Sequence, residues 1–400
     1  MPPAKPTLDL LRSLTDAHVL QALMGEPRLT RAELAERTGI SKPTVSESVR
    51  RLEAAGVVLD TGARTTGRGG VGTYYTISDA AGCALVIAIA PEGVVAETID
   101  PRGTVRARAT GTVERTADLV RVRRTVRATA RRGATERGLP VRLAVVSAAD
   151  PVDRRTGRLV HLPDAPFLLG ELSPVAALDG LVVGPVLVDN DVNWAARAER
   201  NARPERLEDF GYLYLGDGLG CAIVADGVVL RGHGGLAGEI AHLVTVGARG
   251  EATAFTEVFA QLGLRRPGTT AVDVDAVRLA LDVDSAAARE TLDAVAAAIS
   301  GVVAAIVALA DPEVAILGGP WGADPRVVAA VDAQCRRLPR PVAVRAATVV
   351  VDAPLVGARR HALEQLRSTI AEDGARSATL STSATPTGSV RRAGSVTPGK

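Results

Sequence analysis

The feature that most constrains the fold is an alternation of short apolar runs with helical runs across residues 83–370. Two apolar runs, Ala84–Ala90 and Val94–Ile99, are separated by a Pro-Glu-Gly turn, which is typical of a β-hairpin. A weaker copy of this hairpin pattern follows at Gly220–Val224 and Val228–Leu230. Two strand-rich lobes with intervening helices predict an α/β domain that carries a ligand cleft between its lobes.

The rest of this region predicts one long helix and several more strands. The helix is expected over Ala117–Arg137, and we interpret its many arginines as a solvated face rather than a DNA-binding patch. The remaining strands are expected at Thr104–Thr110, Val141–Val146, Val186–Val188, Tyr212–Leu215, Val314–Leu317 and Thr348–Val351.

Composition narrows the class of protein. The chain has 400 residues, of which 46% are hydrophobic and 23% charged, a balance typical of a soluble protein of two or three domains. Its three cysteines are far apart, so no disulfide framework is expected. The beginning lacks an apolar signal region, and the most apolar run, Val295–Leu309, is too short to span a membrane. We therefore expect a cytoplasmic protein with no membrane partner.

The segment 29–52, LTRAELAERTGISKPTVSESVRRL, predicts a helix-turn-helix. Thr30 followed by Glu33 forms a capping box at the start of the first helix. Gly39 supplies the left-handed residue of the turn, and Ser41 caps the second helix. In such motifs the second helix lies in the major groove of DNA.

Two strands, Val57–Leu59 and Thr73–Ile77, enclose a basic Gly-rich loop that predicts a wing beside this motif. Residues 1–80 carry ten basic and nine acidic residues, and Ser48 stands where an apolar side chain would pack better. A small helical interaction module is therefore the alternative. The expected DNA contacts are Ser41, Lys42, Thr44, Ser46, Glu47, Arg50, Arg64 and Arg68.

Residues 8–370 resemble the transcriptional-regulator branch of the ROK family (repressor, open reading frame, kinase). The resemblance implies an actin-like (ribonuclease H-like), two-lobed sugar-kinase fold and a homodimer or homotetramer. We expect a winged helix-turn-helix at 8–78, an effector and oligomerisation domain at 83–370 and a disordered tail at 374–400. Besides the helix-turn-helix, the motifs that carry the resemblance are PVDRRTGRL at 151–159, VDNDVNWAARAE at 188–199, YLYLGDGLGCAIVADGVVLRGHGGLAGEIAHL at 212–243 and ILGGP at 316–320.

The resemblance also implies a set of sugar contacts. In the family an Asn-Asp pair, a Glu-x-x-His unit and a further Glu hold the sugar hydroxyls, and the Asp is the general base of the kinases. The matching base position here is Asp191, and Glu239 and His242 are spaced one helical turn apart. The expected sugar-binding residues are Asp164, which replaces a common Asn, together with Asn190, Asp191, Glu239, His242 and Glu257.

Several departures from the family pattern bear on chemistry. The first strand, Ala88–Pro91, lacks the acid and glycines that anchor nucleotide phosphates, and Asp217 replaces a Thr in the second phosphate loop. Residues 147–150 lack the usual Gly-Pro-Gly of the sugar loop. The Cys-rich zinc cluster of the family is missing from 244–255, so no metal is expected. From these losses we expect no catalytic residue, no cofactor and no enzyme activity.

Together these observations predict a DNA-binding transcriptional regulator, a repressor of carbohydrate-related genes, that binds a palindromic operator and responds to a sugar or sugar derivative. Two alternatives remain open. One is a ROK-type sugar kinase with a DNA-binding appendage. The other is a regulator that responds to a protein partner and keeps a vestigial pocket.

Overall fold

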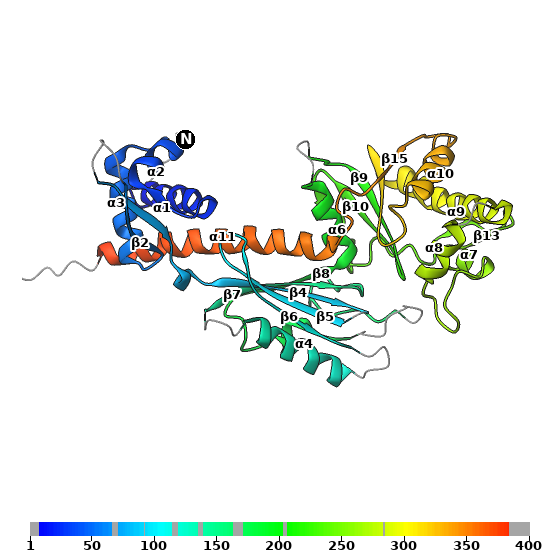
Figure 1. Cartoon of the computed structure of the whole chain (residues 1–400), viewed down its shortest axis with the longest axis horizontal. Coiled ribbons are helices and arrows are strands. Elements are labelled where there is room, and N and C mark those ends of the chain that lie inside the picture. The colour runs from blue at the N-terminus through cyan, green and yellow to red at the C-terminus, as the bar shows by residue number, and fades with distance from the viewer. Residues whose placement is uncertain are drawn as a thin grey trace, which may run out of the picture. The chain divides into compact units, whose positions relative to one another are not determined.

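The computed structural model describes residues 8–65, 71–91, 93–113, 119–134, 139–162, 171–202, 206–282 and 285–383 (Figure 1). The chain divides into two compact units. One combines residues 1–81 with 367–400, and the other comprises residues 82–366. We call the first the N-terminal unit and the second the two-lobed unit.

The N-terminal unit is a three-helix bundle with a small antiparallel sheet of order β1-β3-β2. Its elements are α1 (Leu8–Gly25), β1 (Leu29–Thr30), α2 (Arg31–Thr38), α3 (Lys42–Ala54), β2 (Val58–Arg64) and β3 (Thr73–Ile77). The core is formed by aliphatic side chains that are fully buried, and they come from all three helices. These are Val19, Leu20 and Leu23 of α1, Leu34 of α2, and Val45, Val49 and Leu52 of α3.

The helix boundaries of the predicted motif are confirmed. The Thr30 amide donates to Oε2 of Glu33 at 2.7 Å, and the Glu33 amide donates to Oγ1 of Thr30 at 3.2 Å, which completes the capping box. Gly39 ends α2 with a φ of 69°, in the left-handed region that glycine adopts without strain. The Ser41 hydroxyl accepts from the Thr44 amide at the start of α3.

A buried ion pair explains the polar residue on the inward face of α3. Oδ1 of Asp16 on α1 accepts hydrogen bonds from the Ser48 hydroxyl at 2.5 Å and from Nη2 of Arg51 at 2.6 Å. The Asp16 and Arg51 side chains are only 1% and 8% exposed. Ser48 is therefore accommodated in the core because its hydroxyl and the Arg51 guanidinium share the Asp16 carboxylate. This shared contact was not predicted from the sequence.

The C-terminal end of the chain differs from the expected division. Helix α11 (Ala353–Ser383) continues through residues that were expected to begin a disordered tail. Within the N-terminal unit, Arg367 donates to the Met24 carbonyl at 3.0 Å. A Cβ on Gly374 would lie 3.0 Å from Leu20 and 3.4 Å from Leu52, so the helix packs closely on α1 and α3 at this glycine. Residues 384–400 of the predicted tail lie outside the described residues.

The first lobe of the two-lobed unit is a five-stranded sheet of order β6-β5-β4-β7-β8. Its first three strands are antiparallel, and β4, β7 and β8 are parallel. Helix α4 (Leu119–Ala134) covers one face through its buried Val122, Val126 and Ala130 (Figure 1). The other elements are β4 (Cys83–Ala90), β5 (Gly93–Ile99), β6 (Val105–Gly111), β7 (Val141–Ala148), α5 (Pro174–Ala177) and β8 (Val186–Asn190).

The second lobe repeats this topology in the order β11-β10-β9-β14-β15. Again the first three strands are antiparallel and the last two join in parallel. The strands are β9 (Phe210–Leu215), β10 (Leu219–Ala225), β11 (Val228–Val229), β14 (Val314–Gly318) and β15 (Ala343–Ala346). The expected duplication of the strand pattern is thus confirmed as two sheets with the same strand order.

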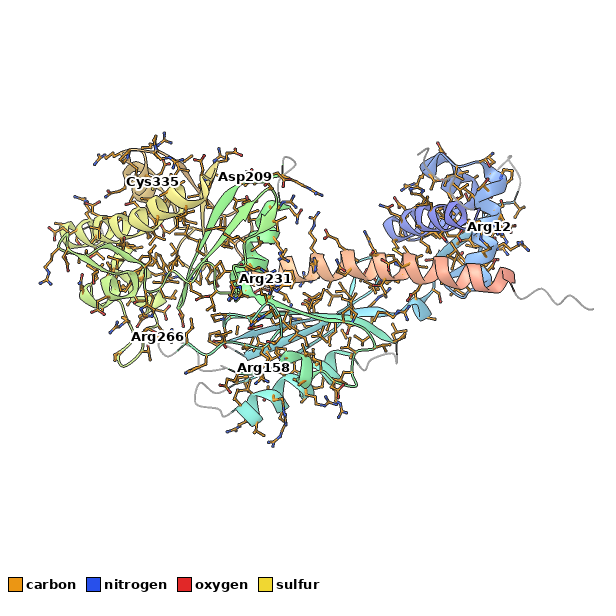
Figure 2. All side chains as sticks on the ribbon, turned by 180° about the vertical axis from the view of Figure 1, so that it is seen from behind. Arg12, Arg158, Asp209, Arg231, Arg266 and Cys335 are labelled. Atoms are coloured by element: carbon orange, nitrogen blue, oxygen red, sulfur yellow. The ribbon has the colours of Figure 1, made fainter. Side chains whose placement is uncertain are left out.

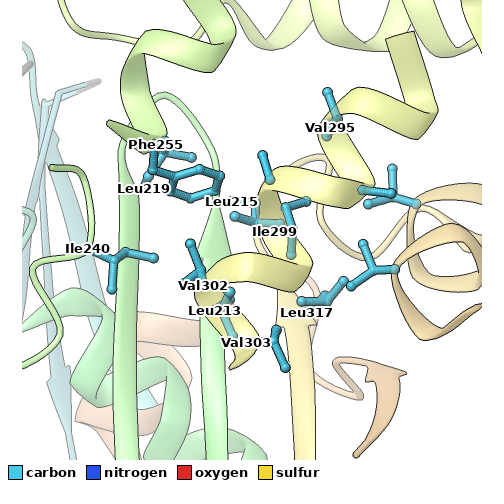
Figure 3. Close-up of a cluster of buried hydrophobic side chains, with 14 of the residues drawn as sticks. Leu213, Leu215, Leu219, Ile240, Phe255, Val295, Ile299, Val302, Val303 and Leu317 are labelled. Atoms are coloured by element: carbon cyan, nitrogen blue, oxygen red, sulfur yellow. The ribbon is translucent and has the colours of Figure 1, made fainter. Parts of the chain in front are cut away.

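Helices and one hairpin complete the second lobe, whose core lies between α9 and the sheet. In Figure 3, Ile299, Val302 and Val303 of α9 pack against Leu213, Leu215 and Leu317 of the strands. The additional elements are α6 (Asp191–Arg200), β12 (Val244–Val246), β13 (Ala252–Ala254), α7 (Phe255–Gln261), α8 (Val274–Asp282), α9 (Ala286–Ala310) and α10 (Pro325–Cys335). By length and composition alone α9 could cross a membrane, but half of its most apolar stretch is buried in this fold.

The last predicted strand was misplaced. The strand that pairs with β14 is Ala343–Ala346 and not Thr348–Val351. The amides of Thr348 and Val349 donate instead to Oε2 of Glu199, at 2.8 and 3.1 Å. The buried Glu199 carboxylate thus accepts the hydrogen bonds that these two amides would otherwise donate to a neighbouring strand. No local sequence pattern predicts such a long-range contact.

Candidate functional site

The first candidate site is the exposed side of α3. Lys42, Thr44, Glu47 and Arg50 are exposed and Ser46 is partly buried, whereas the opposite side of the helix lies in the core. Ser41, also exposed, uses its hydroxyl at the helix N-terminus, where it lies 2.8 Å from the Thr44 hydroxyl. Polar side chains and helix N-terminal amides at one end of α3 form a surface suited to phosphate and base edges.

Most cations on this surface already have carboxylate partners. Nη2 of Arg50 lies 2.7 Å from Oε1 of Glu47, and this pair holds the pKa of the Glu47 carboxyl below its ordinary value. Arg64 makes a similar pair with Asp60 at 2.9 Å. Lys42, by contrast, makes no ion pair with any residue in the described ranges. Arg68, the other expected wing contact, lies outside those ranges.

The second candidate site is a cleft of about 630 Å³ in the two-lobed unit, lined by residues of both lobes. Four of the expected sugar contacts line it: Asn190, Asp191, Glu239 and His242. Glu257 does not, because its half-exposed carboxylate pairs with Arg265 at 3.1 Å, although the neighbouring Thr256 does line the cavity. Asp164 lies outside the described residues.

Three consecutive polar residues at the end of β8 have different roles. Asp189 is 3% exposed and its carboxylate accepts from Asn193 at 2.8 Å and from Arg197 at 3.1 Å. Asn190 caps α6, because its Oδ1 accepts from the Val192 amide at 2.9 Å. Asp191 begins α6 and lines the cavity. A buried ion cluster and a helix cap therefore fix the backbone that presents the Asp191 carboxylate.

The loop that carries Glu239 and His242 is not helical. Glu239 lies in irregular backbone and His242 in a turn, both between β11 and β12, so their three-residue spacing does not place them on one helix face. Gly238 holds the loop against β10: its carbonyl accepts from the Cys221 amide at 3.0 Å, and a Cβ on Gly238 would lie only 1.9 Å from the Cys221 carbonyl oxygen. Nearby, Nε of Arg231, labelled in Figure 2, lies 3.3 Å from Oδ1 of Asp189. These contacts position Glu239 at the cavity.

An acidic cavity residue that the sequence did not predict is Asp150. Asp150 follows β7, is 2% exposed and lines the cleft. Burial and then the charges of Asp191 and Glu239 raise its pKa to about 7, and enclosure within the cleft likewise raises the pKa of Glu239 to about 7. Between the ordinary pKa of a carboxyl group and pH 7, each of these two groups is protonated in the folded chain and ionised in the unfolded chain. The free energy of unfolding therefore decreases as the pH rises through this range.

The phosphate loop at Gly216–Gly220 also lines the cleft, in part. Nη2 of Arg266, labelled in Figure 2, lies 3.3 Å from Oδ2 of Asp217. A lone carboxylate at this position would repel a bound phosphate, but Arg266 offsets the charge of Asp217 and so reduces that repulsion. One of the two arguments against phosphoryl transfer is thereby weakened.

The segment expected to lack a zinc cluster is a β-hairpin formed by β12 and β13. Its turn is held by Glu251, whose carbonyl accepts from the Gly247 amide at 2.6 Å and whose carboxylate accepts from Gln261 at 2.9 Å. Among the residues that the structure describes, no group of three or more His, Cys, Asp or Glu side chains is placed to hold a metal ion.

Two sheets of the same strand order, with a cleft lined by residues of both lobes, define the actin-like sugar-kinase class of fold. The ROK family model matches residues 141–364, and the chain belongs to the ROK family. A winged helix-turn-helix DNA-binding model matches residues 12–58, so the chain carries a DNA-binding domain before its ROK domain.

Relatives include both kinases and regulators. N-acetylmannosamine kinase of Salmonella typhi is 28% identical over 212 residues, which is 50% of this chain and 69% of the relative. A solved ROK family transcriptional regulator, a homologue of the E. coli MLC protein, has a TM-score of 0.60 at 16% identity and covers 91% of this chain and 99% of its own. A ROK family glucokinase from Streptomyces griseus, solved with glucose and AMPPNP, has a TM-score of 0.53 at 22% identity and covers 70% and 99%.

These relatives contradict the expectation that the chain is not an enzyme. The N-acetylmannosamine kinases match half of the chain, and the likeness extends to solved glucokinases. The argument from missing phosphate motifs was too strong, since Asp217 is charge-compensated by Arg266 and Asp191 keeps its place in the cavity.

Proposed function

We propose that this chain is a cytoplasmic transcriptional repressor of carbohydrate-related genes whose operator binding is changed by a sugar or sugar derivative in the cleft. It acts as a homodimer or homotetramer on a palindromic operator, because paired winged modules read paired half-sites. The observation that carries the proposal is that a single chain contains a winged helix-turn-helix and a sugar-sized cleft with Asn190, Asp191, Glu239 and His242 in its lining.

Helix α11 supports coupling between the two functions. Asp352, Ala353, Pro354 and Leu355, at the start of this helix, line the cleft. Residues from Arg367 onward belong to the N-terminal unit. A ligand that binds one arrangement of the cleft more tightly than another shifts the populations of the two arrangements. In this proposal the continuous helix α11 couples the arrangement of the cleft to the N-terminal unit.

Lys42→Ala tests the DNA-binding surface. We expect the variant to bind all DNA sequences about 3–10-fold more weakly and to reduce the salt dependence of binding by about one counterion, because Lys42 is exposed, unpaired within the described residues and placed to contact a phosphate. The measurement is fluorescence anisotropy with the intergenic DNA upstream of the gene, repeated at several salt concentrations.

Arg249→Ala is the matched control, since this arginine is 86% exposed and lies in the two-lobed unit. It removes the same charge and is expected to leave DNA affinity unchanged. Equal losses for the two variants would show that net charge and not the α3 surface sets the affinity, which would contradict the assignment of this surface.

A second candidate function is phosphoryl transfer to a sugar hydroxyl, favoured by the position of Asp191 in the cavity and by the kinase relatives. In this function the Asp191 carboxylate accepts the proton of the attacking hydroxyl. The test is ATP consumption by the full chain with a panel of hexoses. Turnover that Asp191→Asn abolishes would assign the kinase function, and no turnover above the protein-free rate would refute it.

A further inference from the structure

The cleft contains a buried carboxyl group without a complete set of partners. Asp150 is 2% exposed and lines the cavity, and its Oδ2 atom is buried without a hydrogen-bond partner among the described residues. Buried polar atoms are almost always hydrogen-bonded, because desolvation without a partner costs free energy. An unpartnered carboxylate oxygen on a side chain that lines a cavity is therefore suited to accept a hydrogen bond from a ligand donor.

The surroundings of Asp150 are acidic. Asp191 and Glu239 line the same cavity and raise the Asp150 pKa by their charge, after burial itself. The cavity arginine, Arg108, is already paired with Glu97 at 2.7 Å, and Arg266 is paired with Asp217. The ionisable side chains of Tyr214, Asp217, Cys221, His242 and Asp352 also line the cavity. The described lining of the cleft thus includes five carboxyl groups, those of Asp150, Asp191, Asp217, Glu239 and Asp352, and one arginine, Arg108.

We propose that the ligand of this cleft is an amino sugar whose ammonium group is held by Asp150 together with Glu239 and Asp191. An ammonium group brings three N–H donors and a positive charge, which suit the unpartnered Oδ2 atom of Asp150 and its acidic surroundings. A bare metal ion fits less well, because no described group of acidic or histidine side chains has metal-binding geometry. The proposal rests on the proposed function of a sugar-responsive regulator and names its ligand class.

The test is calorimetric titration of the full chain at pH 7 with D-glucosamine, D-mannosamine and D-galactosamine. Each is compared with its neutral parent hexose and its N-acetylated form. We expect at least one amino sugar to bind about tenfold or more tightly than both neutral counterparts, since charge-assisted hydrogen bonds are the stronger ones. In Asp150→Asn this preference should fall to about threefold or less, because the amide has lost the charge.

Two controls separate charge recognition from misfolding. Asp150→Asn conserves side-chain shape and removes a buried carboxyl, so its unfolding temperature at pH 7 should not be lower than that of the parent chain. Asp275→Asn, at a side chain that is 91% exposed on α8, should keep the full preference for the amino sugar.

Three results would overturn the proposal. They are equal or tighter binding of a neutral hexose, an undiminished amine preference in a folded Asp150→Asn variant, and no binding of any of the three amino sugars at millimolar concentration. DNA affinity measured without sugar distinguishes this failure from failure of the proposed function. Intact DNA binding without amino-sugar binding would refute only the proposed ligand class. Amino-sugar binding without DNA binding would refute only the proposed role as a DNA-binding regulator.

Discussion

Asp16→Ala is expected to lower the stability of the N-terminal unit by about 3–5 kcal/mol, the range for removing one partner of a buried ion pair. The variant removes the carboxylate that accepts from the Arg51 guanidinium at 2.6 Å and leaves this 8% exposed group with only the longer contact to Glu47, at 3.8 Å. It also removes the acceptor of the Ser48 hydroxyl. Because these contacts join α1 to α3, the helix that we propose to contact DNA loses its support, and DNA binding should be lost with it.

Urea unfolding of the full chain, combined with hydrogen exchange at the α3 amides, measures this effect. Ser48→Ala is a milder comparison, because it removes one hydrogen bond and leaves the charges paired, and it should cost about 1–2 kcal/mol. The double variant Asp16→Leu/Arg51→Met should be more stable than Asp16→Ala alone, since it buries no unpaired charge. A loss below about 1 kcal/mol for Asp16→Ala would contradict the structural role given to this pair.

Gly238→Ala is expected to disable the cleft. The new Cβ would lie 1.9 Å from the Cys221 carbonyl oxygen, at a φ of +96° that alanine rarely adopts, so the loop must move away from β10. Backbone strain of this kind costs about 1–3 kcal/mol in stability. Because Glu239 is the next residue, we also expect sugar affinity to fall about tenfold or more, which corresponds to about 1.4 kcal/mol.

Gly234→Ala is the matched control in the same loop, because a Cβ there would meet nothing within 4 Å. Thermal unfolding and sugar titration of the two variants measure the difference directly. The control should resemble the parent chain in both. If Gly238→Ala bound sugar as the parent does, the loop would not position a ligand contact.

Local signals in the sequence predicted the local structure well. The capping box of Thr30 and Glu33, the turn at Gly39 and the cap at Ser41 all involve residues within a few positions of one another. The duplicated hairpin pattern predicted two sheets, since alternation of apolar residues reports directly on strands.

Contacts between distant segments were not predictable from the sequence in the same way. Asp16 and Arg51 are 35 positions apart, and Glu199 binds amides about 150 positions away, which displaced a predicted strand. The family resemblance pointed to Asp191 and Glu239, which line the cavity. It also pointed to Glu257, whose carboxylate pairs with Arg265 and does not line the cavity. Asp150 was not predicted because it stands where the family pattern has a different residue. Its burial at the cavity wall in the structure identifies it as a cavity residue.

The most direct test of the central claim is anisotropy titration of the full chain against its own upstream intergenic DNA at fixed salt, with and without the amino-sugar panel. Salt must be fixed because phosphate contacts make the affinity strongly salt-dependent. A sugar-responsive regulator predicts a dissociation constant of about 10⁻⁸ M or lower for specific DNA, at least about 10³-fold tighter than for scrambled DNA. It also predicts that one sugar changes this value. Equal affinity for specific and scrambled DNA, unchanged by every sugar, would contradict the account.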